Sequence, residues 1–142
     1  FTVDESTLPA QQDAAVGLYG GMTRAPNMDN PQTKDFVKAY EAAYKIVPGS
    51  YAQQAYDAAM LIDSAVKAAG GAGDADKLRA AIKKADFTSL RGKFKFNTNG
   101  FPIQDFYLVK VAKRPDGKFQ TEIAEKVFTD YADPHAKDCP LK

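Results

Sequence analysis

Several classes of protein are disfavoured by what this sequence lacks. It has a single cysteine, Cys139, so no disulfide can form within the chain. Its only histidine, His135, is spaced from Cys139 like half of a metal site, but two ligands do not make a structural zinc site. Neither positive nor negative charge dominates, since 19 basic and 18 acidic residues give a net charge of +1. We therefore expect no bound metal, no cofactor and no nucleic-acid partner.

Long apolar runs are also absent. The segment from Ala58 to Ile62 is ended by Asp63, far short of the roughly 20 apolar residues that a membrane span needs. No basic segment followed by an apolar one opens the chain, and Phe1 stands where an initiator methionine would be. We expect a chain without a signal peptide that has been cut from a longer protein.

No group of side chains indicates catalysis. His135 lies in a proline-containing tail, and no Ser–His–acid or Cys–His set can be assembled around it. Glu122 and Glu125 are typical of the solvent-exposed face of a strand and not of an acid–base pair. Gly20-Gly21 is not followed by the residues that complete a phosphate-binding loop. We therefore expect no catalytic residue and no enzyme activity.

What is present is typical of one globular domain with an α/β or α+β architecture. Helical spacing predicts three main helices, near residues 31–46, 51–69 and 75–85. The Asn30-Pro31 pair begins the first, Gly70-Gly71 ends the second, and Asp74 caps the third. Apolar residues wrap most of the way round the second helix, which should therefore be largely buried.

Strands are expected on either side of these helices. A short helix from Leu8 to Ala15 precedes a strand from Gly17 to Met22. After the helices the period changes: residues 91–96 alternate basic with apolar residues and glycine, as a half-buried strand does. Turns at residues 97–100 and 115–117 then separate two further strands, at residues 105–112 and 119–128.

Four stretches together resemble one family: NPQTKDFVKAY (30–40), YAQQAYDAAML (51–61), FTSLRGKFKFNTNG (87–100) and PIQDFY (102–107). In order and spacing they resemble the type I periplasmic solute-binding proteins, closest to the leucine/isoleucine/valine-binding group. The resemblance implies an α/β fold of two lobes joined by three crossovers, with the ligand in the cleft between them.

The resemblance further implies that this chain is the C-terminal portion of such a protein, with helices packed on a small mixed sheet. Residues 1–22 would cross over from the second lobe, residues 23–112 would belong to the first lobe, and residues 113–142 would form a C-terminal strand and tail. One chain of this length would then supply one wall of the cleft.

By the same resemblance, the function is that of a periplasmic, that is extracytoplasmic, solute-binding subunit of an ABC importer. Its ligand would be an amino acid or another small carboxylate, aromatic acids included, and its protein partner the ABC permease in the membrane. Two alternatives stay open: a ligand-sensing receptor domain on the same fold, and a truncated fragment that self-associates.

The candidate ligand-binding residues are Tyr51, Gln54, Phe1 and Thr2. Tyr51 opens the second helix, where unpaired N–H groups and the positive dipole end suit a carboxylate, and Gln54 lies one turn further on the same side. The resemblance places Phe1 and Thr2 beside the cleft. The competing interpretations are a core tyrosine for Tyr51, a capping or interlobe hydrogen bond for Gln54, and a frayed end for Phe1 and Thr2.

The second helix also predicts self-association. An apolar face left uncovered by the missing part of the fold usually becomes an interface. We expect contact through Ala52, Ala55, Ala59 and Ile62, or through a strand edge near Phe94, whereas the intact protein should be a monomer.

Overall fold

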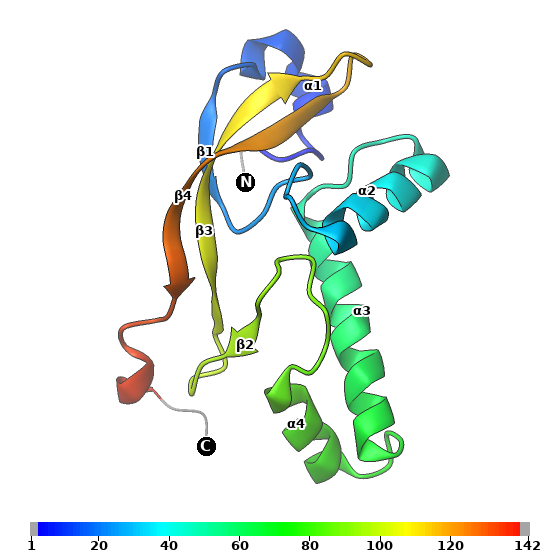
Figure 1. Cartoon of the computed structure of the whole chain (residues 1–142), viewed down its shortest axis with the longest axis vertical. Coiled ribbons are helices and arrows are strands. Elements are labelled where there is room, and N and C mark those ends of the chain that lie inside the picture. The colour runs from blue at the N-terminus through cyan, green and yellow to red at the C-terminus, as the bar shows by residue number, and fades with distance from the viewer. Residues whose placement is uncertain (1–2, 140–142) are drawn as a thin grey trace.

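The computed structural model describes residues 3–139, which form a sheet beside a layer of helices (Figure 1). In chain order the elements are α1 (Leu8–Gln11), a 3-10 turn (Gln12–Ala15), β1 (Tyr19–Met22), α2 (Pro31–Tyr44), α3 (Ser50–Ala69), α4 (Ala75–Lys84), β2 (Lys95–Phe96), β3 (Pro102–Lys113), β4 (Phe119–Tyr131) and a second 3-10 turn (Ala136–Asp138). The three main helices and the later switch to strands confirm the α/β prediction.

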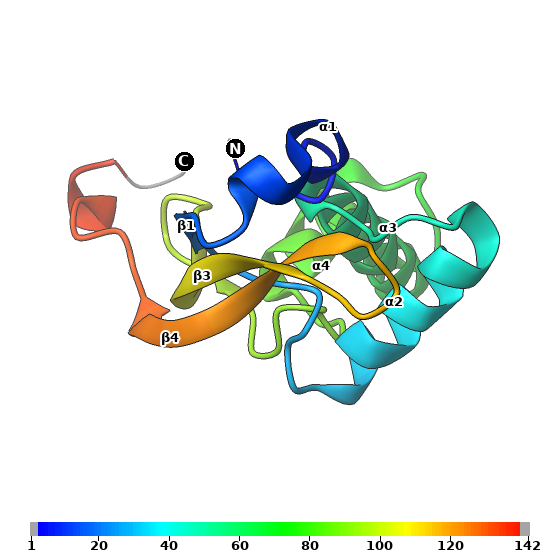
Figure 2. The ribbon, with the colours of Figure 1, turned by 90° about the horizontal axis from the view of Figure 1, so that it is seen from above.

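The sheet is organised around β3. Both β1 and β4 pair with residues 107–110 of β3, so they flank it on opposite edges, while β2 pairs with its first residues. From above, β3 and β4 form one strongly twisted ribbon (Figure 2). Every strand pair within residues 3–139 is antiparallel. The expected mixed sheet is therefore wrong for this part of the chain, because no parallel partner strand lies among these residues.

The helix boundaries follow the local signals in the sequence. Asn30 caps α2 by accepting a hydrogen bond at its side-chain oxygen from the Thr33 N–H (2.7 Å), and Asp74 accepts from the N–H groups of Asp76 and Lys77. At the other end of α3, Gly70 adopts the left-handed conformation (φ 75°) that ends many helices. These three predicted boundaries are confirmed.

The predicted strand at residues 91–96 is shorter in the structure, where only Lys95 and Phe96 form a strand. A tight turn precedes it, with a bridge between Ser89 and Gly92 and a positive φ of 83° at Gly92. The Arg91 side chain turns toward α3 and is mostly buried. Alternation of residue types was therefore a poor guide to a segment held by tertiary hydrogen bonds.

The expected burial of α3 is also wrong. Its buried side chains are those of Ser50, Gln53, Asp57 and Ala65, whereas Ile62 is 55% exposed. The apolar stripe faces solvent because no other element within residues 3–139 covers it. None of the helices in this described range is both long and apolar enough to cross a membrane.

The apolar core is small and is built on one face of β3. Alternate residues Tyr107, Val109 and Val111 point to that face and are almost fully buried. Tyr107 and Val109 pack with Met22 and the connector that follows β1, and Val111 packs with Leu8 and other residues near the start of the chain. The main helices α2, α3 and α4 contribute no residue to either cluster, so other contacts must fix their position.

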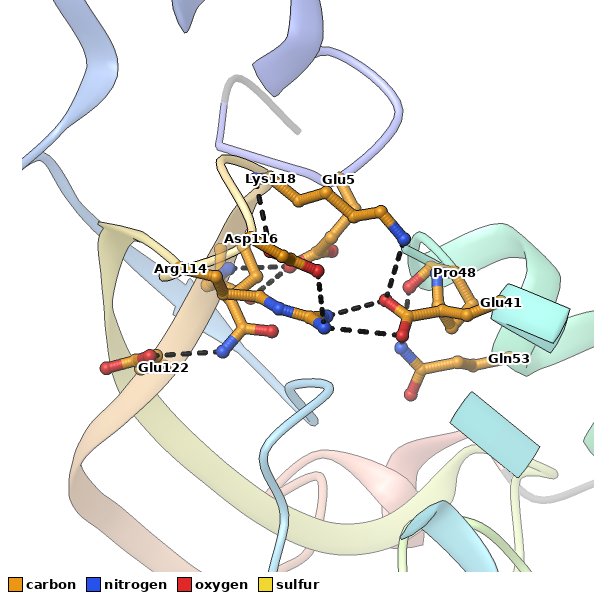
Figure 3. Close-up of polar contacts among 10 residues, drawn as sticks. Glu5, Glu41, Pro48, Gln53, Arg114, Asp116, Lys118 and Glu122 are labelled. Atoms are coloured by element: carbon orange, nitrogen blue, oxygen red, sulfur yellow. Dashed lines mark hydrogen bonds and ion pairs between the residues drawn. The ribbon is translucent and has the colours of Figure 1, made fainter. Parts of the chain in front are cut away.

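Polar groups join the β3–β4 turn to the helices (Figure 3). The Arg114 guanidinium donates to both carboxylate oxygens of Glu41 near the end of α2 (2.5 and 3.3 Å) and to Asp116 within the turn (3.0 Å). The Lys118 ammonium lies 3.8 Å from the same Glu41 carboxylate. Because the Arg114–Glu41 pair is bidentate and half-buried, it fixes the orientation of the turn better than a single surface ion pair would.

Glu5 forms a second polar contact between distant segments, linking the start of the chain to β4. Its buried carboxylate accepts hydrogen bonds from the N–H and the hydroxyl of Thr121 (2.7 and 2.6 Å). Burial raises the pKa of Glu5, and the two Thr121 bonds offset only part of that rise. The segment before α1 is thereby held against the sheet.

Candidate ligand-binding site

A pocket of about 530 Å³ opens where the sheet meets the helices. Its lining comes from residues 21–24 at the end of β1 and just after it, the first two turns of α3, the first half of β3, and Arg91. The polar side chains among the lining residues are those of Thr23, Arg24, Ser50, Gln54, Arg91 and Gln104. This is the size of a site for a small molecule.

The N-terminus of α3 forms part of the pocket, but its charge is already matched. The Asp4 carboxylate accepts a hydrogen bond from the Ser50 N–H (2.9 Å) and from the N–H and hydroxyl of Ser6 (3.0 and 2.6 Å). Gly49 permits this approach, since a Cβ at that position would lie 2.6 Å from an Asp4 oxygen. The Ser50 N–H is therefore already bonded within the chain, and the expected binding of a ligand carboxylate at this helix end stays a prediction.

The pKa of Asp4 reflects two opposing effects. Burial raises it, but the hydrogen bonds from Ser6 and Ser50 together outweigh burial, so that the pKa lies below its ordinary value of 3.8. The carboxylate is thus ionised at neutral pH and acts as the cap of α3 from a distant part of the chain.

We expect Asp4→Ala to lower the free energy of unfolding by about 1–2 kcal/mol, because the variant removes the cap of α3. Since the folded pKa of Asp4 lies below the unfolded one, the contribution is complete above the unfolded value of about 3.8 and disappears as pH falls through the folded value. Urea denaturation at pH 7 and pH 3 measures both effects. Asp13→Ala, which removes an exposed partner of Lys113, is the control; an equal loss there would contradict the capping role.

The structure treats the four sequence-predicted site residues differently. Gln54 lines the pocket, as expected of a ligand-binding residue. Tyr51 is 60% exposed and is not part of the lining. Phe1 and Thr2 lie outside the described residues. Contact of Gln54 and Tyr51 with a ligand stays a prediction.

Arg91 is held rigidly at the pocket by three neighbours. Its Nε donates to the buried carboxylate of Asp57 (3.2 Å), and its Nη1 donates to Oε1 of Gln104 (2.7 Å). Its guanidinium carbon lies 4.4 Å from the centre of the Phe94 ring, within range of a cation–π contact. The same Asp57 carboxylate accepts hydrogen bonds from the Leu90 N–H and the Ser89 hydroxyl, so it accepts three hydrogen bonds in all.

Arg24 has no such set of partners. Its side chain is buried, with the residue only 2% exposed, and neither terminal guanidinium nitrogen has a hydrogen-bond partner within residues 3–139. Burial, and then the nearby charge of Arg91, lower the pKa of Arg24 to about 10, while Asp57 and Asp4 oppose that fall. The pocket therefore contains an arginine that remains charged at neutral pH and is poorly compensated.

Arg24 is the functional candidate that sequence reasoning missed. One signal was available: it is the only charged residue in the connector MTRAPNM (22–28), whose residues Ala25, Pro26 and Met28 are buried. A lone cation in an apolar connector is unusual, because arginine is rarely buried unless it is paired. The sequence alone did not reveal that the guanidinium of Arg24 would lack, among the described residues, the partners that a buried arginine normally has.

Chemically, the pocket is suited to binding an anion. Two guanidinium groups line it, and the acidic group that contacts one of them, Asp57, already accepts three hydrogen bonds. Within residues 3–139 no three His, Cys, Asp or Glu side chains are grouped as a metal site would require. His135 and Cys139 are both exposed.

Comparison with known proteins places the chain in a family. The sequence pattern of the family described as "Periplasmic binding protein" matches residues 1–118. The chain belongs to the periplasmic binding proteins. A similar protein is Leu/Ile/Val-binding protein homolog 6 of Brucella abortus, which is 32% identical over 140 residues; the match covers 94% of this chain and 35% of that relative.

Solved structures agree with this assignment. The solute-binding protein of an ABC transporter from R. palustris, in complex with benzoate, is 35% identical with a TM-score of 0.84, over 94% of this chain and 36% of that one. A solute-binding protein from Rhodopseudomonas palustris BisB5, in complex with 3,4-dihydroxybenzoic acid, is 31% identical with a TM-score of 0.81, over 92% and 36%. The predicted type I periplasmic-binding-protein fold is confirmed, and this periplasmic binding protein chain spans about a third of the length of its relatives.

Proposed function

We propose that this chain forms one wall of the ligand cleft in an extracytoplasmic solute-binding subunit of an ABC importer. The observation that carries the proposal is the pocket between the first turn of α3 and β3, in which Arg24 and Arg91 present positive charge. Relatives bind benzoate and 3,4-dihydroxybenzoic acid, and another is named for leucine, isoleucine and valine. The ligand proposed here is accordingly a small amino acid or another carboxylate, with no catalytic step.

In this proposal the ligand bridges two lobes and shifts a hinge toward its closed form, which then docks on the membrane permease. Residues 1–22 cross over from the other lobe, residues 23–112 belong to the lobe of the pocket, and residues 113–142 complete that lobe at the C-terminal end. The described pocket is the share of the cleft that this chain contributes. Gln54 and Tyr51 are proposed to contact the ligand from α3.

The test compares the 142-residue chain with the protein as its gene encodes it. We expect the chain alone to bind benzoate or leucine more weakly than about 1 mM, because one wall cannot bury most of a small ligand. The protein in its encoded form should bind one of them in the micromolar range or tighter. Isothermal titration calorimetry on both samples measures this. Tight one-to-one binding by the monomeric 142-residue chain would contradict the one-wall proposal.

A further inference from the structure

We infer that Arg24 is the residue that binds the carboxylate of the solute. The inference rests on the proposed solute-binding function and assigns its charge recognition to one side chain. Arg24 lines the pocket, is 2% exposed, and has both terminal guanidinium nitrogens without a hydrogen-bond partner in the described part of the chain.

An unpartnered buried guanidinium is costly for the ligand-free protein. Removing an ion from water has a large free-energy cost, which an opposite charge or several hydrogen bonds must offset. Arg24 instead lies close enough to Arg91 for the two positive charges to repel each other. A carboxylate would offset both effects, because its two oxygens match the paired N–H groups of a guanidinium.

The two carboxylates whose charge acts on Arg24 already accept hydrogen bonds from other groups. Asp57 accepts from Ser89, Leu90 and Arg91, and Asp4 accepts from Ser6 and Ser50. The Gln104 carbonyl oxygen accepts from Arg91. The Gln53 carbonyl oxygen is also unpartnered within residues 3–139, but Gln53 is not part of the pocket lining.

Arg24 and Arg91 are therefore expected to differ in role. Arg91 is fixed by Asp57, Gln104 and the Phe94 ring before any ligand arrives. It contributes positive potential and shape. Arg24 contributes the free hydrogen-bond donors, and an anion that enters the pocket meets these donors in a site where water is largely excluded, which strengthens the interaction.

The experiment uses the protein as its gene encodes it, with benzoate and its neutral analogue benzamide as probes. The variants are Arg24→Met, which keeps much of the side-chain volume without the charge, and Arg79→Met, which removes an exposed arginine of α4 paired with Asp76. Calorimetry gives the affinities, and thermal denaturation without ligand gives the melting temperature. For the wild type we expect benzoate to bind more tightly than benzamide.

Arg24→Met should weaken benzoate binding roughly 10- to 100-fold, the range expected for a lost charge-assisted hydrogen bond, and weaken benzamide binding much less, because the amide carbonyl oxygen is uncharged. Its ligand-free melting temperature should equal or exceed that of the wild type, because the variant removes an uncompensated buried charge. Arg79→Met should change neither affinity. If Arg24 had a purely structural role, Arg24→Met would instead lower the ligand-free melting temperature.

Three outcomes would overturn the inference. In the first, Arg24→Met binds benzoate as tightly as the wild type. In the second, Arg24→Met melts at a lower temperature and loses affinity for benzoate and benzamide equally. In either case binding of solutes by the wild type leaves the proposed function standing. In the third, the wild type binds neither probe nor leucine, and the proposed function fails together with the inference.

Discussion

Replacing Asp57 with alanine should lower the free energy of unfolding by about 3–5 kcal/mol, the range for breaking a buried ion pair on one side. Asp57 is 2% exposed and accepts hydrogen bonds from the Ser89 hydroxyl (2.7 Å), the Leu90 N–H (2.8 Å) and Arg91 Nε (3.2 Å). The variant leaves all three donors without an acceptor and frees the turn that links α4 to β2. Urea denaturation followed by circular dichroism measures the loss.

The control for this prediction is Asp63→Ala on the same helix. Asp63 is exposed and pairs with Lys67, one turn further on, and such surface pairs contribute about 0.3–0.5 kcal/mol. A double-mutant cycle adds Arg91→Met, and the second substitution should restore part of the stability because it removes one stranded donor. Equal losses for Asp57→Ala and Asp63→Ala would contradict the assigned role of Asp57.

The second large effect is expected in the association of the 142-residue chain. The stripe along α3 that contains Ala55, Ala59 and Ile62 is exposed, and Met60 and Tyr56 beside it are exposed as well. We expect the chain to sediment as a dimer or a larger assembly at micromolar concentration, since an apolar face of this kind becomes an interface. Ile62→Arg should raise the dissociation constant at least about tenfold, because burying one isoleucine side chain stabilises by about 1.5–3 kcal/mol.

Analytical ultracentrifugation over a concentration series tests this association. Lys84→Glu, on the exposed surface at the end of α4, is the matched control and should leave the dissociation constant nearly unchanged. The alternative contact, a strand edge near Phe94, stays a prediction: Phe94 directly precedes β2, and its ring packs against Phe87, Phe96 and Arg91. A wild-type chain that remains monomeric at tens of micromolar would contradict the prediction.

Features of the fold that depend on neighbours in sequence could be predicted. Asn30 and Asp74 cap their helices through hydrogen bonds to residues two or three positions away. The helical period of residues 31–44 is equally local. The family and its fold were also recognisable, because the resemblance extends along most of the chain and does not depend on one motif.

Features that depend on distant residues could not be predicted. The cap of α3 comes from Asp4, and the turn before β2 is fixed by Asp57; in both cases a carboxylate acts on backbone far along the chain. The burial of α3 was misjudged because an apolar stripe shows which surface favours burial, but not whether its cover lies in the same stretch of sequence. The role of Arg24 could not be predicted for a related reason. Only the three-dimensional structure shows that its terminal guanidinium nitrogens have no hydrogen-bond partner among the described residues.

The central position of β3 has a consequence for the order of folding. Its pairing with β4 closes only the short turn at residues 114–118, whereas its pairing with β1 joins Met22 to Tyr107 across all three main helices. Closing the larger loop costs more chain entropy, and contacts between distant residues slow folding. The β3–β4 hairpin should therefore be structured early in refolding, with β1 docking last. Since Arg24 lies two residues after the end of β1, the pocket would acquire Arg24 only in that final step.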